Sequence, residues 1–328
     1  MKLDVQLTEE RWAMREPFEI AGQVIEELPL LLVEVRSPDG TTGRAEAAGV
    51  DYDGETPQTM CAQVEGVADR LRDGITGADL MQWLPRGGAR NALDCALWDW
   101  RAKRNGVPAW QAAGLAPLKP LLTACTVGLG TLADTRRRAR ALAGAPLVKV
   151  KVDGQRHLEQ VHAVRGELPQ VRLIVDANQS WSCALLERLL PELVALGVEM
   201  VEQPVPRGQD EALARLASPL PLVADESCTD RGSLPTLVGR YQGVNIKLDK
   251  TGGLTEALAL AREARTLGLD VMVGNMCGTS LGMAPAFLVA QLARWVDLDG
   301  PLFQTQDRDD SLRYEGGTVH PPRPELWG

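Results

Sequence analysis

The stretch VKVKVDG, residues 148–154, places two lysines in a run of valines. Its apolar residues alternate with period two and are β-branched, which predicts a strand rather than a helix. Because successive side chains of a strand point to opposite faces, Lys149 and Lys151 share one face and the valines share the other. The charged face therefore cannot lie against an ordinary apolar core.

This strand belongs to a series that recurs along the chain. From about residue 121 onward, helical segments separate eight apolar strands, at LLTACTVGL, LVKVKVD, RLIVDAN, VEMVEQPV, PLVADES, GVNIKLD, LDVMVGN and RWVDLDG. Intervals of 25, 26, 23 and 22 residues separate the charged residues near five strand ends, Lys151, Asp176, Glu202, Asp225 and Lys247. One βα unit per interval predicts a parallel barrel, because a closed ring leaves no edge strand. The valines would face the helices, and the lysines would face the axis at the open end, solvated and able to pair.

The first part of the chain has a different pattern and predicts a separate α+β domain. Residues 28–47 have the pattern of two strands joined by an Asp-Gly turn, and residues 89–106 that of a helix ending at glycine. We predict a capping domain at residues 1–115, a (β/α) barrel of modified TIM type at 116–305, and a tail at 306–328 that returns to the capping domain.

Composition limits the partners that we expect. A formal charge of −9 disfavours a nucleic-acid surface, and the run Arg136–Arg138 has the pattern of an ordinary surface helix. The chain begins without a secretory pattern and has no run of 18 apolar residues, so we expect a cytoplasmic protein with no membrane partner. The six cysteines lie far apart without a C-x-x-C pair, which indicates free thiols rather than zinc sites or disulfides.

Three carboxylates at equivalent places on consecutive strands predict a metal site. Asp176, Glu202 and Asp225 would converge at the barrel mouth, where three negative charges repel one another unless a cation compensates them. Ligation by oxygen alone favours a hard divalent ion, most naturally Mg²⁺. Asn178 shares a face with Asp176 and is expected to contact the site or a substrate. The alternative is three separate strand ends, each in its own salt bridge.

Lysines flank these three strands. Lys151 and Lys247 are expected to face each other across whatever the metal ion holds. Repulsion between neighbouring ammonium groups and a divalent cation is expected to lower their pKa values, so that Lys149 tunes the site and Lys151 acts as a base. Strand alternation places Lys247 and Asp249 on one face and Lys250 off it.

Such a site suits removal of a proton next to a carboxylate. A positioned base contributes only about 10²–10⁴-fold by itself, so a cation must stabilise the negative charge that develops. With a base on each face of the carbon, one removes the proton and the other returns it from the opposite side. The predicted result is inversion of a stereocentre.

The motifs together resemble the enolase superfamily, in its muconate-lactonizing-enzyme branch, where a lysine base with magnesium is an established pattern. The matching motifs are KVK (149–151), DAN (176–178), VEQP (201–204), ADES (224–227) and NIKLDKTGGLTEA (245–257), with NALDCALWD in the leading domain. The resemblance implies Mg²⁺ bound by Asp176, Glu202 and Asp225, with the substrate carboxylate on that ion. It implies Lys151 and Lys247 as the acid–base pair.

Within this branch the chain is most similar to the dipeptide epimerases. In VDLDG, Asp297 and Asp299 resemble the pair that grips the free α-ammonium group of a dipeptide, although Asp before Gly is also ordinary turn chemistry. The resemblance implies a small dipeptide as the partner. The implied role is interconversion of L-Ala-D-Glu and L-Ala-L-Glu in the recycling of cell-wall peptides. The sequence leaves homo-oligomerisation open.

The first loop of the leading domain departs from the pattern expected for a glutamate side chain. Family members that prefer glutamate are expected to carry an arginine there, whereas EIAGQVIEELPL has Val24, Glu26 and Glu27. The second loop, GVDYDGETP, is acidic as well. A neutral or cationic second residue of the dipeptide is therefore an alternative to glutamate.

Two other interpretations stay open. The same scaffold could carry out N-acylamino-acid racemisation, o-succinylbenzoate synthesis or cycloisomerisation, which share the metal ion and lysines but do not need Asp297 and Asp299. A non-catalytic barrel that binds anions through its lysines is the remote alternative. The three carboxylates disfavour it, because without a metal ion they would repel such a ligand.

Overall fold

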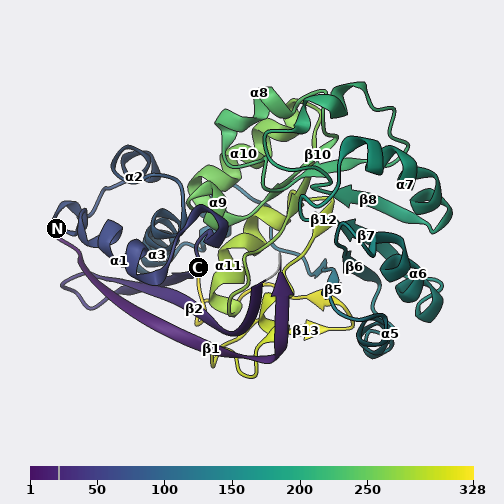
Figure 1. Cartoon of the computed structure of the whole chain (residues 1–328). Coiled ribbons are helices and arrows are strands. Elements are labelled where there is room, and N and C mark those ends of the chain that lie inside the picture. Colours follow the sequence, from purple (N-terminus) through teal and green to yellow (C-terminus); the bar gives the residue numbers. More distant parts are fainter. Residues whose placement is uncertain (21–22) are drawn as a thin grey trace.

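The structure is a computed structural model that describes residues 1–20 and 23–328. Its N-terminal part, which we call the cap, is an antiparallel sheet of order β1-β2-β3 covered by helices (Figure 1). The strands and helices of the cap are β1 (Asp4–Ile20), β2 (Gln23–Arg36), β3 (Thr42–Ala47), η1 (Asp51–Asp53), α1 (Pro57–Glu65), η2 (Ala68–Arg70), α2 (Gly77–Trp83), α3 (Gly88–Asn105) and α4 (Ala109–Ala112).

Local sequence explains the main elements of the cap. Gly40, in the predicted Asp-Gly turn between β2 and β3, has φ +88°, a conformation that glycine adopts without strain. The predicted helix α3 ends at Gly106, which has φ +62°. Gly43 lets β3 approach α3, because a Cβ atom there would lie 2.2 Å from the backbone nitrogen of Trp100. The turn and the helix are as predicted.

The second part is a sheet of eight parallel strands in sequence order. The strands are β5 (Cys125–Val127), β6 (Leu147–Lys151), β7 (Arg172–Asp176), β8 (Val198–Glu202), β9 (Leu222–Ala224), β10 (Gly243–Ile246), β11 (Asp270–Val273) and β12 (Trp295–Val296). The two ends of the sheet meet where the Ala124 N–H donates to the carbonyl oxygen of Val296 at 2.7 Å. All eight predicted strands are present, and the predicted barrel of modified TIM type is confirmed.

Helices cover the outside of this barrel (Figure 1). The helices of this part of the chain are α5 (Leu132–Ala141), α6 (His157–Glu167), α7 (Cys183–Ala195), η3 (Asp210–Arg215), η4 (Arg231–Ser233), α8 (Leu234–Leu237), α9 (Leu248–Thr251), α10 (Leu254–Thr266), α11 (Ser280–Ala290) and η5 (Gly300–Phe303). Of these, α9 contacts α3 of the cap and η5 contacts β1. The connection between β8 and β9 contains the short helix η3 rather than a full α-helix.

The barrel interior has an apolar floor. Seven of the eight strands, all except β10, contribute one side chain from the strand or its start, and the set is Ala124, Leu147, Ile174, Met200, Val223, Met272 and Trp295. Val148 and Val150 belong instead to the large core that includes the helices, as their alternation predicted. Lys149 and Lys151 share the parity of Leu147, so they stand above the floor, toward the barrel mouth.

The C-terminal segment runs back to the cap (Figure 1). Its strand β13 (Tyr314–Glu315) pairs with β14 (Thr318–Val319), and β14 pairs with β4 (Leu121–Leu122). The Gly328 N–H donates to Asp99 of α3 at 2.8 Å, and Arg308 lies 2.6 Å from both Glu10 and Glu46.

In the described part of the chain, no helix is both long and apolar enough to span a membrane. All six cysteines are free, as predicted.

Candidate active site

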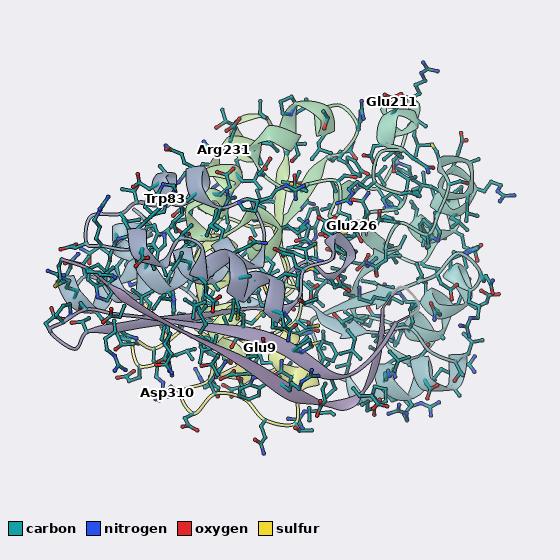
Figure 2. All side chains as sticks on the ribbon, turned by 60° about the vertical axis from the view of Figure 1, so that its left-hand side comes forward. Glu9, Trp83, Glu211, Glu226, Arg231 and Asp310 are labelled. Atoms are coloured by element: carbon teal, nitrogen blue, oxygen red, sulfur yellow. The ribbon has the colours of Figure 1, made fainter. Side chains whose placement is uncertain are left out.

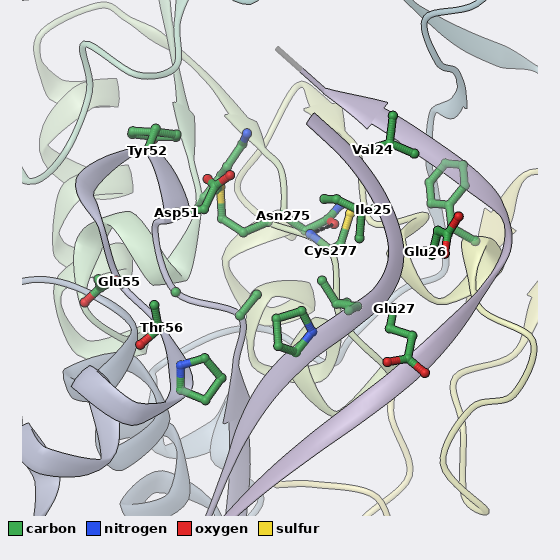
Figure 3. A pocket seen from close by; sticks show the side chains of 18 of the residues that line it. Val24, Ile25, Glu26, Glu27, Asp51, Tyr52, Glu55, Thr56, Asn275 and Cys277 are labelled. Carbon is green, nitrogen blue, oxygen red and sulfur yellow. Dashed lines mark hydrogen bonds between the residues drawn. The ribbon is translucent and has the colours of Figure 1, made fainter. Parts of the chain in front are cut away.

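A cavity of about 700 Å³ lies between the cap and the barrel mouth. Residues Val24 to Glu27 of β2 form one of its sides, while Asp51 and Tyr52 lie across from them (Figure 3). Asn275 and Cys277, from the loop after β11, lie between these two cap segments. Residues 21–22 of the first cap loop are outside the described residues.

One lysine joins three acidic side chains on the barrel side of this cavity. The Lys149 Nζ atom lies 3.0 Å from Asp176 Oδ2, 2.8 Å from Glu202 Oε2 and 2.9 Å from Asp297 Oδ2. Lys151, one step further along β6, donates to Asp176 Oδ2 at 3.0 Å and to Asn178 Oδ1 at 2.8 Å. Lys149 is 2% exposed and Lys151 is 8% exposed. The prediction that the lysines pair with acids is confirmed, but the expectation that they are solvated is wrong, because the cap covers the barrel mouth.

The opposite side of the mouth carries a second group of lysines. Lys247 follows β10 and donates to Asp225 Oδ2 at 2.7 Å, while Lys250 donates to Asp225 Oδ1 at 2.5 Å. Strand alternation wrongly placed Lys250 away from the site, because β10 ends at Ile246 and the chain continues as helix α9. For the same reason Asp249 does not share a face with Lys247; its Oδ1 accepts from the Gly49 N–H of the cap at 2.9 Å.

The order of the strands separates the two predicted bases. Strand β6, with Lys151, and strand β10, which leads to Lys247, are separated by β7, β8 and β9. Those three strands end at or beside Asp176, Glu202 and Asp225. The three carboxylates thus lie on the strands between the two lysines, as their spacing predicted.

Neighbouring carboxylates determine the pKa values of two lysines in this cluster. Burial alone lowers the pKa of Lys247, but the charges of Asp225 and Glu202 outweigh it and raise the pKa above its usual value. The pKa of Lys149 is raised in the same way, mainly by Asp176 and Asp297. The prediction of lowered lysine pKa values assumed a bound divalent cation and stays a prediction; direct carboxylate contacts raise the pKa values of Lys149 and Lys247.

The pKa values of the three carboxyl groups are shifted in opposite directions. Burial and the neighbouring charge of Asp176 raise the pKa of Glu202 to about 7. Burial also acts to raise the pKa values of Asp176 and Asp225, but their lysine partners outweigh it and hold both values below the usual range. The positive charge of the lysines is therefore what keeps these two acids ionised at the barrel mouth.

The acidic cluster fits a divalent cation in its chemistry. Its donors are all carboxylate oxygens, the set that Mg²⁺ prefers. Asp176 Oδ2 and Glu202 Oε2 both lie within 3.0 Å of the Lys149 Nζ atom, so the two carboxylates converge on one positive charge. Within residues 1–20 and 23–328, no three His, Cys, Asp or Glu side chains form a ready-made metal-binding group, and ammonium groups contact the candidate ligands instead.

The Asp297 and Asp299 side chains meet beside β5. The Thr126 N–H donates to Asp299 Oδ2 at 2.7 Å, and its hydroxyl donates to Asp297 Oδ1 at 3.5 Å. Burial, followed by the adjacent charge of Asp297, raises the pKa of Asp299 well above its usual value. Both acids line the cavity, so a cationic group of a ligand could reach them.

Asn178 is held in a backbone conformation that is rare for residues other than glycine. Its φ is +40°, and that of Gln179 is +67°. The Asn178 N–H donates to Asp176 Oδ1 at 3.0 Å, and its side-chain amide donates to Glu226 Oε1 at 3.5 Å. These contacts turn the amide oxygen toward Lys151. A positive φ at a residue other than glycine is typical of functional sites.

Sequence reasoning assigned no role to several residues of the site. Gln203 has φ +31°, and its Oε1 accepts from the Asp225 N–H at 2.8 Å, which links the ends of β8 and β9. Thr126 and Asn275 stand at or after strand ends, so the regular spacing of strands could have found both. Glu226 follows a predicted ligand directly, but no periodicity indicates that it points into the cavity.

A capped (β/α)₈ barrel with acidic strand ends flanked by lysines defines the class of protein. Two family models agree with it: "Mandelate racemase / muconate lactonizing enzyme, N-terminal domain" matches residues 2–114, and "Enolase C-terminal domain-like" matches residues 131–325. The chain belongs to the enolase superfamily, in the mandelate racemase and muconate lactonizing enzyme group. The predicted resemblance is confirmed.

Two curated relatives are isomerases. The L-Ala-D/L-Glu epimerase of Escherichia coli K12 is 42% identical over 318 residues, which cover 96% of this chain and 99% of that protein. The N-acetyl-D-glutamate racemase of a Pseudoalteromonas species is 45% identical over 251 residues, which cover 76% of this chain and 79% of that protein.

Two solved structures share the whole fold. An enolase family member from Agrobacterium tumefaciens, described with bound sodium and L-Ala-L-Glu, is 42% identical with a TM-score of 0.94 and covers 99% of this chain and 100% of its own. A dipeptide epimerase from Methylococcus capsulatus, complexed with Mg and L-Arg-D-Lys, is 30% identical with a TM-score of 0.92 and covers 100% and 99%.

Proposed function

We propose that this chain is a dipeptide epimerase, which inverts the α-carbon of the C-terminal residue of a dipeptide by proton transfer. The observation that carries this proposal is the placement of Lys151 at the end of β6 and Lys247 directly after β10, the two strands that flank the three carboxylate strands. Its relatives include an L-Ala-D/L-Glu epimerase and an N-acetyl-D-glutamate racemase, which are both isomerases of an amino-acid α-carbon.

Asp176, Glu202 and Asp225 are the candidate ligands of the metal ion. Bound Mg²⁺ would supply positive charge that stabilises negative charge on the carboxylate of the substrate. Asp225 and Glu202 are also the cause of the raised pKa of Lys247, so neutralising their charge removes that cause. A neutral amine then becomes accessible to one of the two lysines.

The two lysines divide the proton transfer between them. In one direction, the neutral amine of Lys151 takes the α-proton as the C–H bond breaks, and the electron pair moves onto the substrate carboxylate. The Lys247 ammonium group then donates a proton to the opposite face of the same carbon. In the reverse direction their roles exchange, so one proton is removed and one is returned and no other reactant is needed. Lys149 holds Asp176 and Glu202 in place.

Asp297 and Asp299 would bind the α-ammonium group of the dipeptide. Both are buried beside β5, and a bound cation would oppose the burial and the Asp297 charge that raise the pKa of Asp299. Residues 1–115, the proposed capping domain, would close over the substrate and contact its side chains, because their two loops line the cavity. Residues 116–305 would carry the chemistry.

A second candidate function is racemisation of an N-acylamino acid, which the 45% identical racemase favours. Such a substrate has the same α-proton and carboxylate but no free ammonium group. It would leave Asp299 without a cationic partner and Asp297 with Lys149 alone, so these two residues favour a dipeptide over an N-acylamino acid.

Solvent deuterium separates the two candidates. The Mg²⁺-loaded protein is incubated in D₂O with a set of L,L-dipeptides and with their N-acetylated forms, and deuterium at the α-carbon is measured by mass. Dipeptide epimerisation predicts exchange in at least one dipeptide and much slower exchange after N-acetylation. Exchange in N-acetylated amino acids but in no free dipeptide would exclude the proposed function.

A further inference from the structure

The cap side of the cavity is strongly acidic. Among the described residues that line it, the cap contributes six carboxylates and a single basic side chain, Arg11. The six acids are Glu9, Glu10, Glu26, Glu27, Asp51 and Glu55. Arg11 lies 3.9 Å from Glu27 and is mostly exposed, so it does not offset the remaining charge.

Several of these acids have partners within the protein. Glu10 binds Arg308 at 2.6 Å, Glu9 accepts from Gln58 at 2.5 Å, and Glu55 accepts from the backbone N–H groups of Val50 and Gly88. Glu26 and Asp51 differ, because no hydrogen bond or ion pair to another described residue involves their side chains. Their charges are available to a ligand.

Besides Glu26 and Asp51 of the cap, one acid of the barrel, Glu226, faces the cavity. Glu226 is 5% exposed, and its only described side-chain hydrogen bond brings Asn178 to Oε1 at 3.5 Å. Its Oε2 atom is buried without any hydrogen-bond partner among the described residues. An unsatisfied buried carboxylate oxygen is costly, and a cationic ligand would satisfy it. Arg207, a barrel cation that reaches the second cap loop, is bound to Asp53 at 2.8 Å.

Geometry directs the substrate side chain toward these acids. The apolar floor fills the barrel below the lysines, and Asp297 and Asp299 would hold the ammonium end of the dipeptide on the β12 side. A side chain on the carbon between Lys151 and Lys247 therefore extends toward the cap loops. We call Glu26, Asp51 and Glu226, which line the cavity from two opposite cap segments (Figure 3) and from the barrel, the acidic wall.

We propose that the epimerised residue has a cationic side chain, an ammonium or guanidinium group, which the acidic wall selects. This inference rests on the proposed dipeptide epimerase function. An anionic side chain would meet only like charges there, and like charges in contact are strongly disfavoured. Val24, in the first cap loop, offers no charge that could hold a carboxylate.

The test compares three dipeptides of similar length on the Mg²⁺-loaded protein: L-Ala-L-Lys, L-Ala-L-Gln and L-Ala-L-Glu. From solvent deuterium incorporation we expect kcat/KM for the lysine dipeptide to exceed that for the glutamine dipeptide by about ten- to hundredfold. The glutamate dipeptide should be the slowest. A preference for L-Ala-L-Glu, or a Lys-to-Gln ratio near one, would overturn the inference while leaving dipeptide epimerisation in place.

Variants locate the preference within the cavity. Asp51→Asn and Glu226→Gln should each lower the Lys-to-Gln ratio by about tenfold, because each removes one charge-assisted contact. The matched control is Glu211→Gln, which removes the same charge at the outer edge of the molecule, far from Glu226 (Figure 2). Because the ratio is measured within one preparation, a reduced folded fraction lowers both rates equally and does not change it. An unaltered ratio in both variants would exclude the acidic wall, and no exchange in any dipeptide would exclude the proposed function itself.

Discussion

The two sides of the cavity are built in different ways. On the barrel side, short contacts hold the charged groups to one another: Lys149 contacts three carboxylates, and Asp225 contacts two ammonium groups. On the cap side, Glu26 of β2 and Asp51 of η1 make no such contact to another described residue. The barrel side is thus organised before a substrate arrives, whereas the charges of the cap are free to respond to the substrate.

The largest effect is expected at the barrel side. Lys151→Ala and Lys247→Ala should each lower epimerisation by about 10²–10⁴-fold, because each removes a positioned acid or base. Each variant should still exchange deuterium into the epimer whose α-proton faces the remaining lysine. Chiral separation of the products, combined with mass, measures both effects. The control is the exposed Lys119→Ala, and undiminished turnover in both variants would exclude the two-base mechanism.

Removal of the metal ion should lower activity through the groups on the barrel side of the cavity, where its candidate ligands lie. Chelation is expected to lower exchange by about 10²-fold or more, with recovery on addition of Mg²⁺, because the charge that develops on the substrate carboxylate is no longer compensated. Asp225→Asn should weaken Mg²⁺ binding, measured by calorimetry without substrate. Glu211→Gln should bind Mg²⁺ as the original protein does. Full exchange in the presence of a chelator would contradict the assignment of Asp176, Glu202 and Asp225.

An intermediate effect on substrate preference is expected at Asp297 and Asp299, the proposed binding site of the ammonium group. Asp299→Asn should lower the ratio of kcat/KM between a free dipeptide and its N-acetylated form by about 30-fold or more, since truncating one partner of a buried charge pair is costly. Kinetic measurement of deuterium incorporation gives both values. A ratio that stays the same would favour the racemase alternative and remove Asp297 and Asp299 from the binding site.

The same contrast explains how far the sequence could predict the site. Period-two alternation holds as long as the chain stays in a strand, so it correctly placed Lys149 and Lys151 on the face above the apolar floor. It failed at Lys250, because β10 had already ended and a helix had begun. The pKa prediction considered repulsion among the lysines and a divalent cation, whereas the direct contacts that carboxylates make with Lys149 and Lys247 depend on side-chain geometry that the sequence does not give.

The contacts of loop residues were beyond sequence reasoning for a different reason. Asn178 and Gln203 have positive φ values, and Glu226 meets Asn178 across two different strand ends. Neither a propensity nor a periodicity specifies such conformations, which depend on packing between loops. Composition alone indicated that the cap loops are acidic, but only the structure distinguishes Glu26 and Asp51 from Glu10 and Glu55, whose charges already have partners.

The smallest expected effect is on stability and concerns the contact between the barrel and the cap at Asp249, which we call the joint. Asp249, beside the barrel mouth, accepts from the Gly49 N–H of the cap at 2.9 Å. Burial, opposed by this hydrogen bond and aided by the charges of Glu55 and Glu46, raises the pKa of Asp249 to about 7 from an ordinary value of 3.8. Between these two values the folded state binds the proton and the unfolded state does not. The contribution to stability is therefore complete below about pH 4 and is lost as the pH rises toward 7.

Asp249→Asn should remove this dependence, because the amide stays neutral and still accepts from Gly49. We expect the difference in free energy of unfolding between pH 5 and pH 8 to shrink by about 2 kcal/mol, measured by urea denaturation. Asp69→Asn, at a side chain that is 99% exposed, is the matched control and should leave the difference unchanged. An equal slope in Asp249→Asn and in the original protein would mean that Asp249 is ionised throughout this range. The joint would then resemble the barrel side, with a compensated charge, rather than a buried neutral contact that links the cap to the strand ends.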